Sequence, residues 1–102
     1  MDVYDLDAQV VEVTGHCPVY HIGDGFPIQE GYKLQAQRLL CLHALTALLP
    51  YYVPLSRGTP PSELGLGSEK TAYLQYPDPY ERTGGGTFIF AVRSVEGRTG
   101  HP

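Results

Sequence analysis

The chain has 102 residues, a formal charge of −4 and an apolar fraction of 42%, which fits one small domain with a limited core. Its seven lysines and arginines are spread along the sequence, so there is no basic patch of the kind that binds nucleic acid or an anionic membrane surface. No apolar run reaches the roughly 20 residues of a membrane span. We therefore expect no nucleic-acid partner and no membrane.

The N-terminus and the cysteine count indicate the compartment. Residues 1–5 lack the basic and apolar regions of a signal peptide, and two cysteines are too few for a disulfide framework. Both features favour the cytoplasm, where thiols stay reduced. We predict an N-terminal arm over residues 1–8, a single domain over residues 9–96 and a disordered tail over residues 97–102.

Two strands are predicted in the first third of the chain. Residues 9–14 are rich in β-branched side chains, which is typical of a strand. Alternation along this strand would place Val11 and Val13 toward the core. The sequence Gly23-Asp24-Gly25 predicts a tight turn into a second, short strand over residues 26–29.

The segment from Leu34 to Leu49 has the one clear helical pattern of the chain. At about 100° per residue, a single stripe of this helix contains four apolar side chains: Leu34, Cys41, Leu45 and Leu48. Pro50 ends the pattern. Free cysteine packs like a small hydrophobe, so we expect Cys41 to be buried on this stripe.

Residues 50–69 are rich in proline and glycine, which predicts a long loop with one short helical turn over residues 61–64. Strands follow over residues 71–76 and 87–95. The second of these is apolar on both faces, which indicates a central, covered strand. The order of elements predicts an α+β domain: a small, mostly antiparallel sheet, one main helix packed on it and a long Pro/Gly-rich loop.

Each of the two cysteines has a histidine close by, in His16-Cys17 and in Cys41-Leu42-His43. Zinc takes four ligands from cysteine, histidine and carboxylates. On a helix, however, Cys41 and His43 would point about 200° apart, so the pair could not bind one ion together. We predict no metal and no cofactor, and a mixed site of His16, Cys17, Cys41 and Asp78 stays open as an alternative.

Thiol chemistry at Cys17 is the second alternative. An imidazole stabilises a thiolate, but His16 and Cys17 are neighbours on extended backbone and would point to opposite faces. His21 or His43 would then have to supply the base. We predict no catalytic residue, and the alternative function is a small metal- or thiol-dependent enzyme or redox protein that uses Cys17 with nearby histidines.

Four motifs in order resemble a known family: Gly15-x-Cys17-Pro18, Gly23-Asp24-x-Phe26, a helix with Cys41 and Ala44-Leu45, and Pro77-Asp78-Pro79. Over residues 10–96 the chain is similar to an uncharacterised family of small bacterial and archaeal proteins. That family often has a third cysteine where this chain has Tyr76. The resemblance implies a fold and a pocket but no established activity. The candidate binding residues are His16, Cys17, Cys41, Tyr76 and Asp78.

The chain has eight tyrosines, a residue type that is enriched at interfaces. Together with the C-terminal end of the helix, three apolar residues of the following loop would be exposed in an isolated chain and are predicted to contact a second copy or a partner: Tyr51, Tyr52 and Leu55. The function that we favour is a non-catalytic cytoplasmic binding or interaction domain that forms a homodimer, or an accessory subunit that binds a protein partner. Nothing in the sequence identifies a small-molecule ligand.

Overall fold

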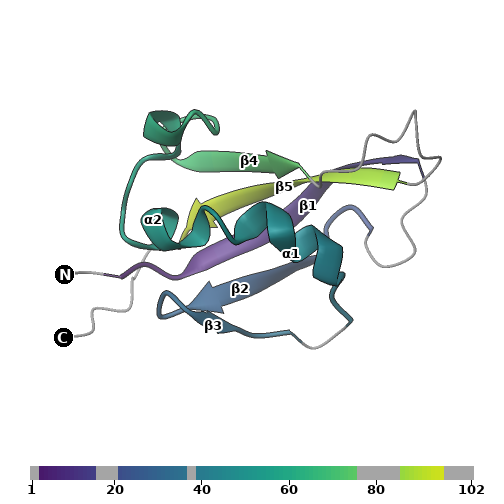
Figure 1. Cartoon of the computed structure of the whole chain (residues 1–102), viewed down its shortest axis with the longest axis horizontal. Coiled ribbons are helices and arrows are strands. Elements are labelled where there is room, and N and C mark those ends of the chain that lie inside the picture. The colour runs from purple at the N-terminus through teal and green to yellow at the C-terminus, as the bar shows by residue number, and fades with distance from the viewer. Residues whose placement is uncertain (1–2, 16–20, 37–38, 76–85, 96–102) are drawn as a thin grey trace.

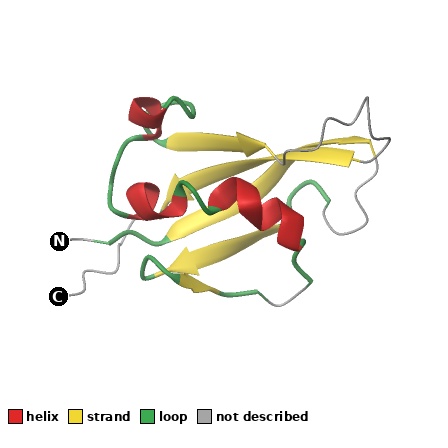
Figure 2. Cartoon of the chain, viewed as in Figure 1, coloured by secondary structure: helices red, strands yellow, loops and turns green. Residues whose placement is uncertain are grey.

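The computed structural model describes residues 3–15, 21–36, 39–75 and 86–95. Its strands form one antiparallel sheet in the order β3-β2-β1-β5-β4. The bounds are Leu6–Gly15 for β1, Gly25–Gln29 for β2, Lys33–Leu34 for β3, Thr71–Gln75 for β4 and Gly86–Ser94 for β5. Helices α1 (Leu42–Leu48) and α2 (Tyr52–Ser56) lie on one face of the sheet, and a 3₁₀ helix, η1 (Pro61–Leu64), precedes β4 (Figures 1 and 2). This is a small α+β fold with an antiparallel sheet, as predicted.

The helices that the structure describes all lie in the connection between the two edge strands. β3 lies at one edge of the sheet and β4 at the other, and the chain between them runs through α1, α2 and η1. It therefore crosses the whole sheet on one face (Figure 1). The core lies between this crossing segment and the sheet.

The centre of the core is aromatic. The ring of Phe90 meets those of Phe26 and Phe88 edge to face, with centroid distances of 5.9 and 5.5 Å, a favourable geometry for aromatic pairs. From the helices, Ala44 and Leu48 reach the same cluster. The other buried members are aliphatic: Leu6, Ala8, Val10, Ile28, Leu55, Ala72, Leu74 and Val92.

The start of β1 corrects the predicted N-terminal arm. Leu6 and Ala8 fall within residues 1–8, yet both belong to the sheet and are fully buried. Leu6 pairs with Ile28 of β2 and with Ser94 of β5. The acidic character of these first residues hides the strand because Asp5 and Asp7 alternate with the buried positions. The predicted tail over residues 97–102 lies outside the described residues.

A β-bulge in β1 overturns the predicted burial of Val11. The pairing with β5 shifts between Val10 and Glu12, so Val11 is an extra residue, and its side chain is 40% exposed. Val10 takes the core position, and beyond the bulge Val13 packs against the core as predicted. One inserted residue reverses the alternation, which periodicity alone cannot reveal.

The predicted helix from Leu34 to Leu49 is wrong in its first half. α1 covers only Leu42–Leu48, and Leu34 belongs to β3, where it pairs with Ile28. The turn before β3 depends on Gly31, whose φ of +82° is left-handed. The spacing from Leu34 to Cys41 fits a helical period. Pairing with β2 nevertheless gives Leu34 an extended backbone conformation, because tertiary contacts override such patterns.

The predicted long loop over residues 50–69 contains two short helices. Pro54 lies in the first turn of α2, where the backbone N–H has no intrahelical partner to lose. Pro61 begins η1, a position that proline also favours, and the predicted helical turn over residues 61–64 is confirmed. In the described part of the chain, three short helical segments therefore stand in place of the one main helix and the long loop that the sequence predicts. None of the described helices is long and apolar enough to span a membrane.

The strand predictions in the second half of the chain hold. β4 and β5 occupy the predicted positions, and β5 is an interior strand between β1 and β4. On the face of β5 away from the helices, Ile89 is half-buried and Ala91 is buried. This burial explains why the sequence of β5 is apolar on both faces. The middle strand of the sheet is β1.

Candidate functional site

Most of the residues singled out by the cysteine motifs fall outside the described part of the chain: His16, Cys17, Tyr76 and Asp78. The described ranges contain no group of three or more His, Cys, Asp or Glu side chains that could hold a metal ion. The site with Cys17 therefore stays a prediction.

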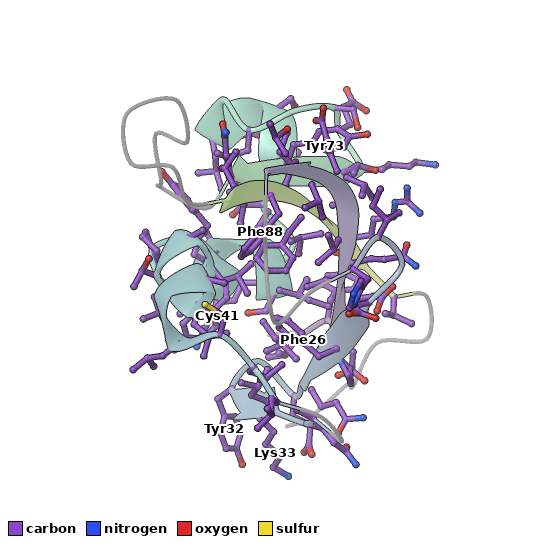
Figure 3. All side chains as sticks on the ribbon, turned by 90° about the vertical axis from the view of Figure 1, so that its right-hand side faces the viewer. Phe26, Tyr32, Lys33, Cys41, Tyr73 and Phe88 are labelled. Carbon is purple, nitrogen blue, oxygen red and sulfur yellow. The ribbon has the colours of Figure 1, made fainter. Side chains whose placement is uncertain are left out.

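Cys41 is the one predicted site residue of this set that the structure describes. It is the N-cap of α1, with extended backbone angles of φ −79° and ψ 116°, and not a residue of a helix interior. Its side chain is a half-buried thiol that packs against the core (Figure 3). Cys41 therefore packs against the core at the start of the helix, but it is half-buried and not buried as predicted.

An apolar groove lies between α1 and the β2–β3 hairpin. Its empty volume is about 450 Å³. Seven side chains line it: Ile28, Tyr32, Leu34, Leu45, Leu48, Leu49 and Tyr52. Ile28 and Leu48 form a buried floor, whereas at the rim Tyr32, Leu34 and Leu49 are 70%, 43% and 60% exposed.

The helix places its leucines on the groove through simple geometry. At about 100° per residue, Ala44 and Leu48 face the sheet, and Leu45 lies on the next row. Leu49, the residue directly after α1, also lines the groove. Leu42 lies about two helical turns before Leu49 and therefore on the same side of the helix. It is 75% exposed, and together with Leu49 it forms an apolar ridge. An exposed ridge therefore runs beside the groove.

The three residues predicted as an interface separate into two kinds. Tyr51 and Tyr52 are half-buried and pack against the core, and Tyr52 also lines the groove. Leu55 is 4% exposed and belongs to the core. Its assignment to an interface is wrong, because α2 turns this side chain inward beneath the crossing segment.

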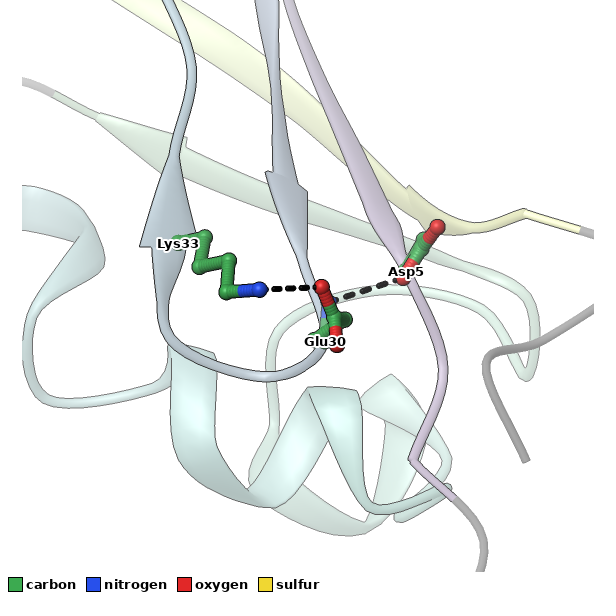
Figure 4. A network of polar contacts seen from close by, with 3 residues as sticks. All are labelled: Asp5, Glu30 and Lys33. Carbon is green, nitrogen blue, oxygen red and sulfur yellow. Dashed lines mark hydrogen bonds and ion pairs between the residues drawn. The ribbon is translucent and has the colours of Figure 1, made fainter. Parts of the chain in front are cut away.

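A polar network fixes the turn that carries Tyr32. The backbone N–H of Glu30 donates to Asp5 Oδ1 at 2.9 Å, and Lys33 Nζ lies 2.5 Å from Glu30 Oε2 (Figure 4). Glu30 itself has a left-handed φ of +56°, a conformation that few residues other than glycine adopt. The contact with Asp5 ties this turn to the start of β1.

Lys33 also links the network to the groove. Its ammonium lies 5.5 Å from the centroid of the Tyr32 ring, within the range of a cation–π contact. The hydrogen bond to Glu30 and, to a smaller extent, the charge of that carboxylate raise the pKa of Lys33. The rim of the groove is thus held by a lysine that stays charged.

The opposite face of the sheet has a different character. Side-chain hydrogen bonds join Gln75 Nε2 to Thr87 Oγ1 at 3.2 Å and Arg93 Nε to Thr71 Oγ1 at 3.2 Å. Tyr73 is exposed among these polar side chains. The apolar groove is therefore specific to the helical face.

Comparison of the chain with models of protein families, with curated proteins and with solved structures finds no match. The similarity to the small bacterial and archaeal family accordingly stays a prediction, and the groove has to be understood from its own residues.

Sequence reasoning missed the part of the groove that β3 contributes. The sequence pattern predicts Leu34 as the start of a helix and gives no role to Tyr32. A signal is present: residues 30–32 contain a glycine and separate two short segments with strand character, which is a pattern of a hairpin. The helical spacing of the leucines outweighed it.

Proposed function

We propose that this protein is a non-catalytic interaction domain of the cytoplasm that binds another protein chain through the apolar groove and the ridge beside it. The observation that carries the proposal is the coincidence of a buried floor, Ile28 and Leu48, with an exposed apolar rim. Apolar side chains that are gathered in one exposed patch mark contact sites in small domains.

The side chains that line the groove are suited to packing against another protein chain. They are five aliphatic side chains and two tyrosines, which supply contact area and hydrogen bonds at their tips. None of the described residues that line the groove has a carboxylate, imidazole or thiol, the groups that serve in proton transfer or covalent catalysis at neutral pH. The half-buried thiol of Cys41 is compatible with a reducing compartment.

Site-specific photo-crosslinking in cells that produce the full chain tests this proposal. A benzophenone amino acid replaces Leu49 at the rim, or Tyr73, which is 51% exposed on the opposite face of the sheet. We expect one discrete protein adduct from position 49 and none from position 73. The added substitution Leu42→Asp should abolish the adduct without unfolding the domain, because Leu42 is exposed.

Three results would contradict the proposal. Absence of a discrete adduct from position 49 would show that no chain binds the groove. Equal adducts from positions 49 and 73, or an adduct that survives Leu42→Asp, would show nonspecific contact. Mass spectrometry of the adduct identifies the bound chain and separates a second copy from a different protein.

A further inference from the structure

The two edges of the sheet differ in how they are covered. At β4, the backbone N–H of Tyr73 donates to the carbonyl of Leu66 at 2.8 Å, and the N–H of Ser68 donates to the carbonyl of Thr71 at 3.1 Å. Gly67 forms a bridge with Ala72 in the same segment. Such cover prevents an edge strand from pairing with another chain. At β3, no described residue provides a comparable cover.

The register of β3 determines which backbone groups face its open side. The N–H of Gln35 donates to the carbonyl of Pro27 at 3.3 Å, and Lys33 pairs with Gln29. In an antiparallel ladder, residues alternate between bonding one neighbour and facing away from it. Leu34, between these two positions, therefore directs its N–H and C=O away from β2, toward the open edge.

We propose that a second copy of this chain binds at the apolar groove and the ridge beside it. In this dimer, β3 of each copy pairs antiparallel with β3 of the other about a two-fold axis through Leu34. The proposal rests on the proposed function and names the partner. In this arrangement the two copies of Leu34 exchange both backbone hydrogen bonds, and the sheet becomes continuous through the dimer. Helices α1 of both copies then lie on the same face.

Self-complementarity favours a second copy over an unrelated chain. Directly opposite side chains point to the same face, so Leu34 meets Leu34 of the second copy at the rim of both grooves. The same register sets Lys33 opposite Gln35, so like charges do not meet. Each copy also offers both a ridge, at Leu42 and Leu49, and a groove that receives one. This is what an isologous interface requires.

The size of the face is sufficient for a dimer. Four side chains contribute most of its exposed apolar area: Tyr32, Leu34, Leu42 and Leu49. Complete cover of these side chains in two copies would bury on the order of 1,000 Å², which is close to the lower limit for a specific interface. The backbone and polar groups of β3 add to that area.

Sedimentation equilibrium of the purified full chain over micromolar concentrations is the first test. We expect a mass of twice 11.2 kDa. Leu34→Pro replaces the leucine side chain by a smaller apolar ring and, among the backbone hydrogen-bonding groups, removes only the outward N–H, since proline is tolerated at the open side of edge strands. The bonds between β2 and β3 remain. This variant should be monomeric. Leu34→Val, the matched control, keeps the N–H and an apolar side chain and should stay dimeric.

Hydrogen exchange of the unmodified chain gives a test that does not depend on the folding of a variant. The amide of Leu34 should exchange at least tenfold more slowly at concentrations that favour the dimer than at high dilution. A monomer at all concentrations would overturn the proposal, while photo-crosslinking at position 49 could still capture another protein and uphold the proposed function. A dimer that persists in folded Leu34→Pro would overturn the pairing through β3.

Discussion

Lys33 Nζ lies 5.5 Å from the centroid of the Tyr32 ring, at the rim of the apolar groove. The same ammonium is hydrogen-bonded to Glu30, whose backbone N–H is held by Asp5. The contact restrains a Tyr32 ring that is 70% exposed, and such pre-organisation lowers the entropy that binding would otherwise cost. The polar turn and the apolar groove form one structural unit.

Replacing Glu30 with glutamine should lower the pKa of Lys33, because the hydrogen bond to the carboxylate is the main cause that raises it. The pKa of Lys33 is higher in the folded chain than in the unfolded chain. The ion pair therefore contributes its full stability to the fold at pH values below the usual lysine pKa of about 10.4, and this stability is lost as the pH rises through the folded pKa. NMR titration of the Lys33 side chain measures this directly. Asp24→Asn, a remote loss of a carboxylate, is the control and should leave the midpoint unchanged. An unchanged midpoint in Glu30→Gln would disprove the contact.

Cys41→Ser should leave the domain at least as stable as the parent. In a buried helix interior, the added hydroxyl would cost about 1–3 kcal/mol if it found no partner. At the N-cap, with extended backbone angles, serine accepts a hydrogen bond from the first turn, and such a cap contributes about 1 kcal/mol relative to alanine. Thermal melts should therefore rank Cys41→Ser above Cys41→Ala. A Cys41→Ser variant that melts below the parent would show that packing of the sulfur outweighs the cap.

The sequence indicated the strands better than the helices, for a physical reason. The turn at Gly23-Asp24-Gly25 is closed by the backbone N–H of His21, which donates to Asp24 Oδ2 at 2.8 Å. Because such bonds join residues close in the sequence, short motifs predict them. The extent of α1 is not local. Leu34 pairs with Ile28 across the β2–β3 hairpin, and no periodicity along residues 34–49 contains that contact.

The groove was predictable only on one side. The apolar end of the helix and Tyr52 were expected to meet another chain, and the structure places both on the groove. The opposite wall depends on β3, which is two residues long and is formed by pairing with β2. The inward turn of Leu55 depends in the same way on how α2 crosses the sheet.

Gly31→Ala should destabilise the domain by about 2 kcal/mol, because the left-handed conformation costs about 1–2 kcal/mol for a residue with a Cβ. Its φ is +82°, and the new Cβ would lie 2.7 Å from Val3 Cγ1. Gly23, with a φ of +96° and open space around it, isolates the conformational part. Urea unfolding should show a larger loss for Gly31→Ala than for Gly23→Ala. In a Val3→Ala background the two losses should become equal, and a difference that persists there would exclude the overlap with Val3.

The β-bulge predicts opposite tolerances at two adjacent valines. Val10 is fully buried, whereas Val11 is the extra, exposed residue. Val10→Thr places a hydroxyl in the core at a cost of about 1–3 kcal/mol, while Val11→Thr should change the free energy of unfolding by less than about 0.5 kcal/mol. The two variants have the same chemistry and β-branched shape, so only burial distinguishes them. If urea unfolding showed equal losses, or a larger loss at Val11, β1 would have no bulge at this point, and its register with β5 would have to shift by one residue.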